Sequence, residues 1–344
     1  MTEILKKQKK FPLIVLEGKP TDIGFQHGRI LKKRIKSTIN WYKNILHKKD
    51  PEIFSLATHF RSEILEFNPN YCDEIEALAA GAEVDPLWIY ALNSRSEIMS
   101  TFKNECTTVF FRNSALLGQN WDWAQELEKL AIIFKIKPEN KPQILMMSEP
   151  GIIGKIGFNS KGLGVCLNFL DSGKICKGVP IHIILRGILE SPTINKAAEL
   201  ILPFKEGKSA NILIADGHGD YIDFEFANKH VFQPKDGGNV FIHTNHYLEN
   251  EELNRGTDLA SSFTRYERAI QMASIIKKSS LSEMQEILLD QTTNELPICR
   301  PYVPDLDLGN VGTVCSIIMN LINLKMHITR GSPLTTDFTT INID

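Results

Sequence analysis

The sequence lacks a stretch of 18 apolar residues, so no membrane-spanning helix is expected. Its first residues are charged and have no apolar core of the kind that a secretory signal contains. It also lacks the HExxH, P-loop and dinucleotide-binding patterns, internal repeats and low-complexity segments. These absences exclude several metal-dependent and nucleotide-dependent classes, and we expect neither a cofactor nor a metal.

Cysteine is scarce, with six among 344 residues and no CxxC pair. Such sparse spacing argues against a dense disulfide framework and favours a reducing, cytoplasmic setting. The cysteines are then free to be core residues or nucleophiles. They stand at positions 72, 106, 166, 176, 299 and 315.

The net charge of −2 is too small and of the wrong sign for an obvious nucleic-acid binder, so no nucleic-acid partner is expected. The charge is nevertheless uneven, because residues 1–49 hold 13 Lys/Arg against 3 Asp/Glu. Such a basic segment could attract an anionic substrate or a membrane surface. The simpler interpretation, which we favour, is a solvated helix face that pairs with the acidic remainder of the chain.

Residues 21–100 have a helical pattern of apolar spacing. Asp-Pro pairs at 50–51 and 85–86 predict helix starts, because an N-cap acid followed by Pro at the first helical position is typical of such starts. Gly81 is predicted to end the helix that begins near Cys72.

Short apolar runs separated by turn residues replace this pattern at about residue 106 and predict strands to about 170 and from 210 to 245. Helices are predicted near 193–202, 258–278 and 281–290, and a closing strand pair at 311–321 and 324–329. This order predicts an α+β protein in which helices pack outside sheets, with a helical N-terminal segment and one compact catalytic unit.

Cys106 lies where the helical pattern gives way to the strand pattern. A lone cysteine is most often a small core residue, but one at the first position of a strand, after a polar loop, is expected to be partly exposed and able to act as a nucleophile. The strand turns at residues 112–114 and returns through 116–123. Antiparallel pairing would place residue 121 or 122 opposite Cys106, so Asp122 can lie beside it.

The run Cys106-Thr107-Thr108, followed by Gly118-Gln119-Asn120-Trp121-Asp122-Trp123, resembles the penicillin acyltransferase family of isopenicillin-N acyltransferase-like proteins. These are N-terminal-nucleophile enzymes, so the resemblance implies a four-layer αββα sandwich. Weaker likenesses follow in the family's order over roughly residues 15–330. They are Glu17-Gly18 to Gly28, Ala215-Asp216 to Glu225, Thr244-Asn245-His246, Cys299-Arg300-Pro301 and Thr313 to Leu321.

The resemblance implies that the precursor cleaves its own Glu105–Cys106 bond. The freed α-amine of Cys106 would then act as the base for its own thiol. Residues 1–105 would form a helical α chain that stays associated with the catalytic β chain, residues 106–344, as an α/β heterodimer, with a higher homo-oligomer possible. The family's penicillin-forming member has Gly before its cysteine, whereas this chain has Glu105, whose carboxylate could assist proton transfer.

Four further residues match the family's motifs. By resemblance, Asp122 positions the new terminus, Asn245 stabilises the oxyanion and Arg300 places a fixed positive charge near the thiol. Thr108 is expected to bond the precursor loop or the terminus. The implied substrates are small-molecule amides or acyl-CoA thioesters, and the acyl group passes through a Cys106 thioester to water or to an amine.

Three other interpretations fit the same residues. His246 could serve as the base of a papain-like Cys–His pair, which would need no cleavage at Cys106. A non-catalytic small-molecule or acyl-binding protein on the same fold, or an unrelated thiol hydrolase, would also fit. A zinc site at His243 and His246 is disfavoured, because residues three apart in a strand point to opposite faces.

Overall fold

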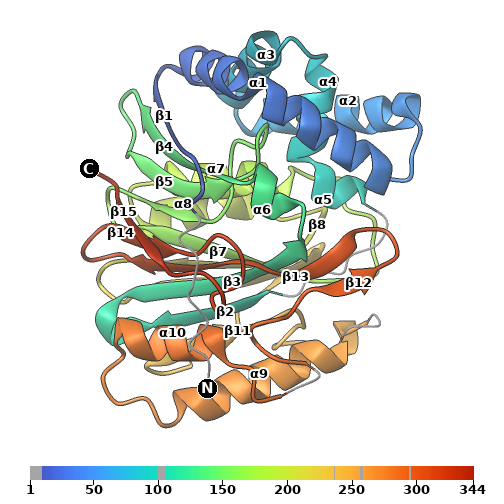
Figure 1. The fold of residues 1–344 in the computed structure, drawn as a ribbon. Coiled ribbons are helices and arrows are strands. Elements are labelled where there is room, and N and C mark those ends of the chain that lie inside the picture. The colour runs from blue at the N-terminus through green and yellow to red at the C-terminus, as the bar shows by residue number, and fades with distance from the viewer. Residues whose placement is uncertain (1–9, 100–105, 236, 256–258, 294–295) are drawn as a thin grey trace.

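The computed structural model describes residues 10–99, 106–235, 237–255, 259–293 and 296–344. Two β-sheets lie face to face in its middle, and helices cover the outer face of each (Figure 1). This arrangement confirms the predicted α+β, four-layer αββα sandwich. No helix in the described ranges has an apolar stretch that would cross a membrane.

The first sheet has eight strands, and only its β1–β4 pair is parallel. In spatial order its strands are β1 (Leu13–Gly18), β4 (Ile132–Pro138), β5 (Ile144–Ser148), β6 (Gly157–Asn159), β7 (Gly164–Phe169), β8 (Lys208–Ala215), β9 (Tyr221–Asn228) and β10 (His230–Phe232). Strand β1 therefore places part of the N-terminal segment in the same sheet as later strands.

The second sheet is antiparallel, and Cys106 directly precedes its strand β2. Its strands are, in order, β11 (Val240–His243), β2 (Thr107–Phe111), β3 (Leu116–Ala124), β13 (Gly309–Asn320), β14 (Lys325–Ile328) and β15 (Thr339–Asn342), with β12 (Val303–Asp305) paired to β13. Strands β2 and β3 pack on β7 of the first sheet, so Cys106 lies close to the space between the sheets.

The helices of the N-terminal segment and α7 cover the first sheet. Helices α9 and α10 cover the second sheet (Figure 1). The N-terminal helices are α1 (Pro20–Ile45), α2 (Asp50–Phe67), α3 (Pro69–Ala82), α4 (Pro86–Asn93) and α5 (Arg95–Ile98). The later ones are α6 (Leu127–Leu130), α7 (Ile181–Leu189), α8 (Ile194–Ile201), α9 (Leu259–Ala273) and α10 (Leu281–Leu289). Single 3₁₀ turns occupy Arg112–Ser114, Leu202–Phe204 and Glu251–Leu253.

Two details of the sequence interpretation were wrong. Gly81 lies inside α3 rather than at its end, and Glu83 caps that helix with a left-handed φ of 52°. A Cβ at Gly81 would lie 2.4 Å from the carbonyl oxygen of Phe25, so this glycine is needed where α1 and α3 touch. The prediction also missed α7, a short helix of nine residues that are all buried.

Candidate active site

Cys106 begins the second sheet directly before β2. Thr107 pairs with Asn120 of β3, and continuing this register brings Trp121 opposite Cys106, with Asp122 next to it. The sequence-based hairpin geometry is thereby confirmed. The expected exposure of Cys106 was wrong, because only 4% of it is accessible. Cys106 packs within the apolar core and lines a pocket.

Side chains from three different elements hold the peptide groups of Cys106. Its backbone N–H donates to Asn245 Oδ1 at 2.7 Å. Its carbonyl oxygen accepts hydrogen bonds from Arg265 Nη1 at 2.8 Å and from Asn168 Nδ2 at 3.1 Å. Such a set fixes the backbone of the cysteine and leaves its side chain to the pocket.

Burial raises the pKa of the Cys106 thiol to about 12, and the negative charge of Asp122 acts in the same direction. A hydrogen bond from the Asp122 backbone and the positive charges of Arg265 and Lys155 act in the opposite direction. The thiol of the intact chain is therefore protonated at neutral pH. A reaction at Cys106 needs a base that removes this proton.

Asp122 is fully buried and pairs across the sheet with Thr313 of β13. The backbone of Arg300 bonds the same threonine, donating to Thr313 Oγ1 at 2.8 Å and accepting from Thr313 N at 3.1 Å. Arg300 therefore comes to the end of β13 that carries the partner of Asp122. Arg265 and Lys155 lower the Cys106 pKa, and the predicted role of Arg300 stays a prediction.

Thr108 acts on Cys106 through an intermediate residue. Its hydroxyl donates to Asn168 Oδ1 at 2.7 Å, and Asn168 Nδ2 in turn donates to the carbonyl oxygens of Cys106 and of His243. Thr108 thereby orients the amide that holds the cysteine. Glu105 and the rest of the predicted precursor loop lie outside the described residues.

Asn245 is held through both its peptide N–H and its side-chain amide. Its Oδ1 accepts from Cys106 and from Arg265 Nη2, the latter at 3.0 Å. Its Nδ2 donates to the carbonyl oxygen of Phe169 at 3.0 Å, and its backbone N–H donates to Ser262 Oγ at 2.7 Å. Because a carboxamide carries two N–H donors, the second one can serve an oxyanion.

Arg265 is a candidate site residue that the sequence interpretation missed. It is 0% exposed and extends from α9 to bond Cys106 O, Asn245 Oδ1, Thr107 Oγ1 and Ser261 Oγ. A guanidinium suits this role because its five donors lie in one rigid plane. Its sequence offers only a helical arginine four residues after a serine, a pattern that surface helices share.

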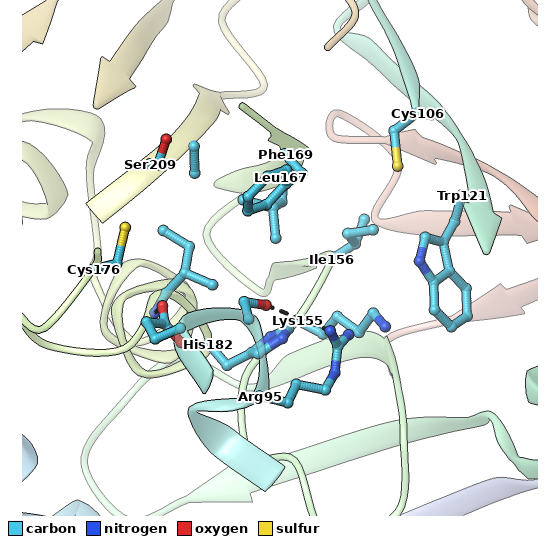
Figure 2. Close-up of a pocket in the computed structure, with 14 residues that line it drawn as sticks. Arg95, Cys106, Trp121, Lys155, Ile156, Leu167, Phe169, Cys176, His182 and Ser209 are labelled. Carbon is cyan, nitrogen blue, oxygen red and sulfur yellow. Dashed lines mark hydrogen bonds between the residues drawn. The ribbon is translucent and has the colours of Figure 1, made fainter. Parts of the chain in front are cut away.

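A pocket extends from Cys106, whose sulfur points toward it, to Cys176 and Ser209 on the far side (Figure 2). Trp121, Ile156, Leu167 and Phe169 supply much of its apolar lining, while Arg95, Lys155 and His182 line another side (Figure 2). The full lining is Arg95, Ser96, Glu97, Cys106, Trp121, Lys155, Ile156, Leu167, Phe169, Cys176, Ile181, His182, Ser209 and Ala210. An apolar acyl group fits such a lining.

Lys155 and Arg95 share one buried counter-ion beneath the pocket. Glu149 accepts from Arg95 Nη2 at 2.7 Å and from Lys155 Nζ, and the Lys155 ammonium lies 3.5 Å from the centre of the Trp121 ring. Burial lowers the pKa of Lys155 to about 8, although Glu149 opposes this. The cluster joins α5, which precedes Cys106 in the chain, to the segment that follows β5.

His246 forms its hydrogen bonds within and beside the segment that carries Asn245, not with Cys106. Its Nδ1 lies 2.8 Å from Ser262 Oγ and 3.1 Å from Thr244 Oγ1, and its ring packs on Phe263 and Tyr266. Burial lowers its pKa to about 3. These contacts argue against His246 as the base of Cys106. In the described ranges, no three His, Cys, Asp or Glu side chains are grouped to hold a metal ion.

The sequence of this chain matches a known protein family. A family model described as acyl-coenzyme A:6-aminopenicillanic acid acyl-transferase matches residues 110–335. The chain is 31% identical over 347 residues to the 40 kDa form of acyl-coenzyme A:6-aminopenicillanic-acid-acyltransferase from Emericella nidulans, covering 95% of this chain and 94% of that protein.

Two solved structures are also similar. One is the Caenorhabditis elegans ortholog of N-acylethanolamine-hydrolyzing acid amidase, with a TM-score of 0.45 and 18% identity, covering 63% of this chain and 93% of that one. The other is a variant of conjugated bile acid hydrolase from Clostridium perfringens. It has a TM-score of 0.49 and 14% identity, and the match covers 70% of this chain and 92% of that one.

Proposed function

Because the chain belongs to the acyl-coenzyme A:6-aminopenicillanic acid acyltransferase family, we propose that it cleaves itself between Glu105 and Cys106 and then carries an acyl group on Cys106. The observation that supports this most is the set of polar side chains on the peptide groups of Cys106. Asn245, Arg265 and Asn168 hold a single cysteine at the wall of a pocket. In a cysteine of a core strand, the backbone of the neighbouring strands normally satisfies these peptide groups.

The first step rearranges one bond. The Cys106 sulfur attacks the carbonyl carbon of Glu105, the C–N bond breaks, and the nitrogen takes up a proton to become an α-amine. Water then opens the thioester, which leaves a carboxylate at Glu105 and a free thiol at Cys106. The hydrogen bond from Cys106 N to Asn245 Oδ1 supports this step, because it fixes the nitrogen that becomes the leaving group.

The freed amine supplies the base for the second step. An α-amine titrates near pH 7.7–8.0, roughly, so it can remove the thiol proton at neutral pH. Asp122, beside Cys106, would hold and orient the resulting ammonium. The thiolate then attacks the carbonyl carbon of an amide or an acyl-CoA, and the amine or the CoA thiol leaves with the proton.

Asn245 is proposed to stabilise the oxyanion of each tetrahedral intermediate through its second Nδ2 proton. One such donor contributes about 2.7–4 kcal/mol of transition-state stabilisation. Arg265 orients this amide and, with Asn168 and Thr108 behind it, keeps the Cys106 carbonyl in place. Arg300 is proposed to add positive charge from the end of β13, where its backbone pairs with Thr313.

The two pieces are proposed to stay together as an α/β heterodimer. Strand β1 pairs with β4 along six residues, and buried ion pairs join Arg95 to Glu149 and Glu74 to Arg186 across the proposed division. Arg95 and Glu97 from the first piece also line the pocket with Cys106. Removal of residues 1–105 would therefore take away both a sheet strand and one wall of the pocket.

The pocket supports a small-molecule amide or acyl-CoA as the substrate, with the acyl chain on Trp121, Ile156, Leu167 and Phe169. The acyl group passes to water or to an amine. We place this reaction in the cytoplasm, because all six cysteines are free thiols, as a reducing compartment maintains.

Intact-mass spectrometry of the purified protein tests the cleavage. We expect pieces of 105 and 239 residues from the wild type and a whole chain from Cys106→Ala. A wild-type protein that stays whole, together with a Cys106→Ala variant that keeps full activity, would overturn the proposal. A whole, folded protein that binds acyl compounds without turnover would favour the non-catalytic alternative.

A further inference from the structure

One carboxylate holds both ends of the segment that carries Asn245. Glu225 of β9 accepts hydrogen bonds from Leu248 N at 2.5 Å, from Glu249 N at 3.2 Å and from His243 Nε2 at 2.9 Å. His243 ends β11 and precedes Asn245 by two residues, whereas Leu248 and Glu249 follow it. The segment 244–247 is thus closed into a loop on the carboxylate of Glu225.

Both ring nitrogens of His243 face oxygen acceptors. Nδ1 lies 2.8 Å from the carbonyl oxygen of Thr244, and Nε2 lies at the Glu225 carboxylate, on which three donors converge. A neutral imidazole has only one N–H, so both hydrogen bonds form together only when the ring is an imidazolium. The contact is therefore an ion pair between His243 and Glu225.

This ion pair crosses the interface between the two sheets. Glu225 belongs to the first sheet and His243 to the second, and both are 0% exposed. Burial by itself would lower the pKa of His243, but the hydrogen bond that its ring donates to Glu225 and the charges of Asp223 and Glu225 raise that pKa above its ordinary value. The charge of His243 is thus maintained by carboxylates from β9.

Several other titratable groups surround the pair. Asp223 also comes from β9, accepts a hydrogen bond from Asn211 of β8 at 2.5 Å, and has a pKa raised to about 7 by burial. His246, whose pKa is lowered by its own burial, lies in the Asn245 segment, and Tyr266 and Arg265 approach from α9. Of these groups, His243 is the one that forms the ion pair with the Glu225 carboxylate.

We propose that the His243–Glu225 ion pair positions Asn245, so that the reaction at Cys106 proceeds only while His243 is an imidazolium. The inference rests on the function proposed above for Asn245. Neither residue lines the pocket, so both are positioning residues that act through the segment 244–247 and not through contact with substrate.

The direction of the pH effect follows from the charge. Below the raised pKa of His243 the pair is intact, and as the pH rises through that pKa the ring loses a proton. One of its two hydrogen bonds is then lost, and the Glu225 carboxylate stays buried without a counter-charge. A displacement of about 1 Å in a positioning group lowers a rate by about 10²-fold. We therefore expect an alkaline limit to kcat that belongs to His243.

Glu225→Gln tests the proposal, with Glu74→Gln as the matched control. Glu74 of α3 forms a similarly buried ion pair with Arg186 of α7, in the helical layer outside the first sheet, whereas His243 belongs to the second sheet. In the processed enzyme we expect Glu225→Gln to lower kcat by about 10- to 100-fold, with KM nearly unchanged. Its alkaline limb should move to lower pH, because His243 loses the carboxylate that raises its pKa. Glu74→Gln should lower Tm and leave the pH profile of kcat in place.

A wild-type kcat and alkaline limb in Glu225→Gln, or the same shift in both variants, would overturn the proposal. A second measurement does not depend on the variant folding or on turnover. In wild-type protein with isotope-labelled histidine, assigned against His243→Gln, NMR should show a charged His243 ring above pH 6.5, roughly its ordinary pKa. A ring that is already neutral at that pH would also overturn it. If His243 is charged but no thioester forms on Cys106, the proposed function is wrong and not the role of the ion pair.

Discussion

Two buried cysteines lie on either side of the same tryptophan and differ in what holds them. Trp121 of β3 pairs with Cys315 of β13 on one side, and the register of β2 brings Cys106 to its other side. Burial raises the pKa of both thiols. Cys315 is a strand residue in the core, whereas the peptide groups of Cys106 are bonded by Asn245, Arg265 and Asn168.

The comparison shows that thiol burial does not distinguish a nucleophile from a core residue in this protein. What differs is the polar support around the backbone and the access to a pocket, which Cys106 lines. Polar side chains that are buried without need would cost stability, so a group of them around one cysteine indicates a function. The predictions below test whether this support, rather than the thiol alone, makes Cys106 reactive.

The largest effect is expected from substitution of the two cysteines by alanine. Cys106→Ala should abolish both self-cleavage and acyl transfer, because it removes the proposed nucleophile of both steps. Cys315→Ala should keep both activities and lose only the stability that a small core deletion removes. Intact mass and acyl-transfer rates measure the two variants side by side. An equal loss of activity in both variants would contradict the assignment of Cys106 as the nucleophile and Cys315 as a core residue.

Removal of the proposed oxyanion donor should have the next largest effect. Asn245→Ala is expected to lower kcat/KM by about 10²–10³-fold, equivalent to about 2.7–4 kcal/mol. Steady-state kinetics on the processed fraction gives this value. The same variant should slow self-cleavage, because Asn245 also holds the Cys106 amide. An unchanged kcat/KM would show that the oxyanion is stabilised elsewhere.

Arg265→Lys is expected to reduce the rate by about tenfold, because an ammonium cannot reproduce the planar contacts of the guanidinium with Cys106, Thr107 and Asn245. The matched control is Arg268→Lys on the same helix, where the arginine binds Asp290. In Arg265→Met the thiol pKa should rise, since the charge of Arg265 lowers it. Alkylation rate against pH measures this, and an identical profile in Arg265→Met and wild type would contradict it.

Thr108→Val should give the smallest effect. The change removes the hydroxyl that orients Asn168 and leaves a buried acceptor with one partner fewer. One such hydrogen bond contributes about 1 kcal/mol, so we expect about a fivefold lower rate or a loss of stability of that size. Thermal unfolding and kinetics together measure it. A loss as large as that of Asn245→Ala would mean that Thr108 contacts the reacting groups directly.

Much of the fold and part of the site could be predicted from the sequence. The Cys106–Asp122 hairpin follows from turn position and register, and the closing strands follow from their apolar runs. The burial of Cys106 could not be predicted, because it results from packing between sheets that are distant in sequence. Strand β1 was also missed, since its pairing with β4 is a contact across more than 100 residues.

Arg265 shows most clearly where sequence reasoning ends. The motif order directed attention to Arg300, whose backbone lies at the partner of Asp122. Arg265 belongs to an amphipathic helix, where an arginine at helical spacing predicts only a solvated face. Its contacts with Cys106 and Asn245 exist because α9 packs against β11, which the sequence pattern does not encode.

Cys106, and no other cysteine, is expected to carry the acyl group. The most direct measurement is a rapid acid quench of the processed enzyme during turnover of a short-chain acyl-CoA, followed by peptide mass analysis. We expect one acyl group on the peptide that begins with Cys106, removable by hydroxylamine, and none on the peptide that contains Cys315. Turnover without an adduct on Cys106, or with the adduct on a different cysteine, would contradict it.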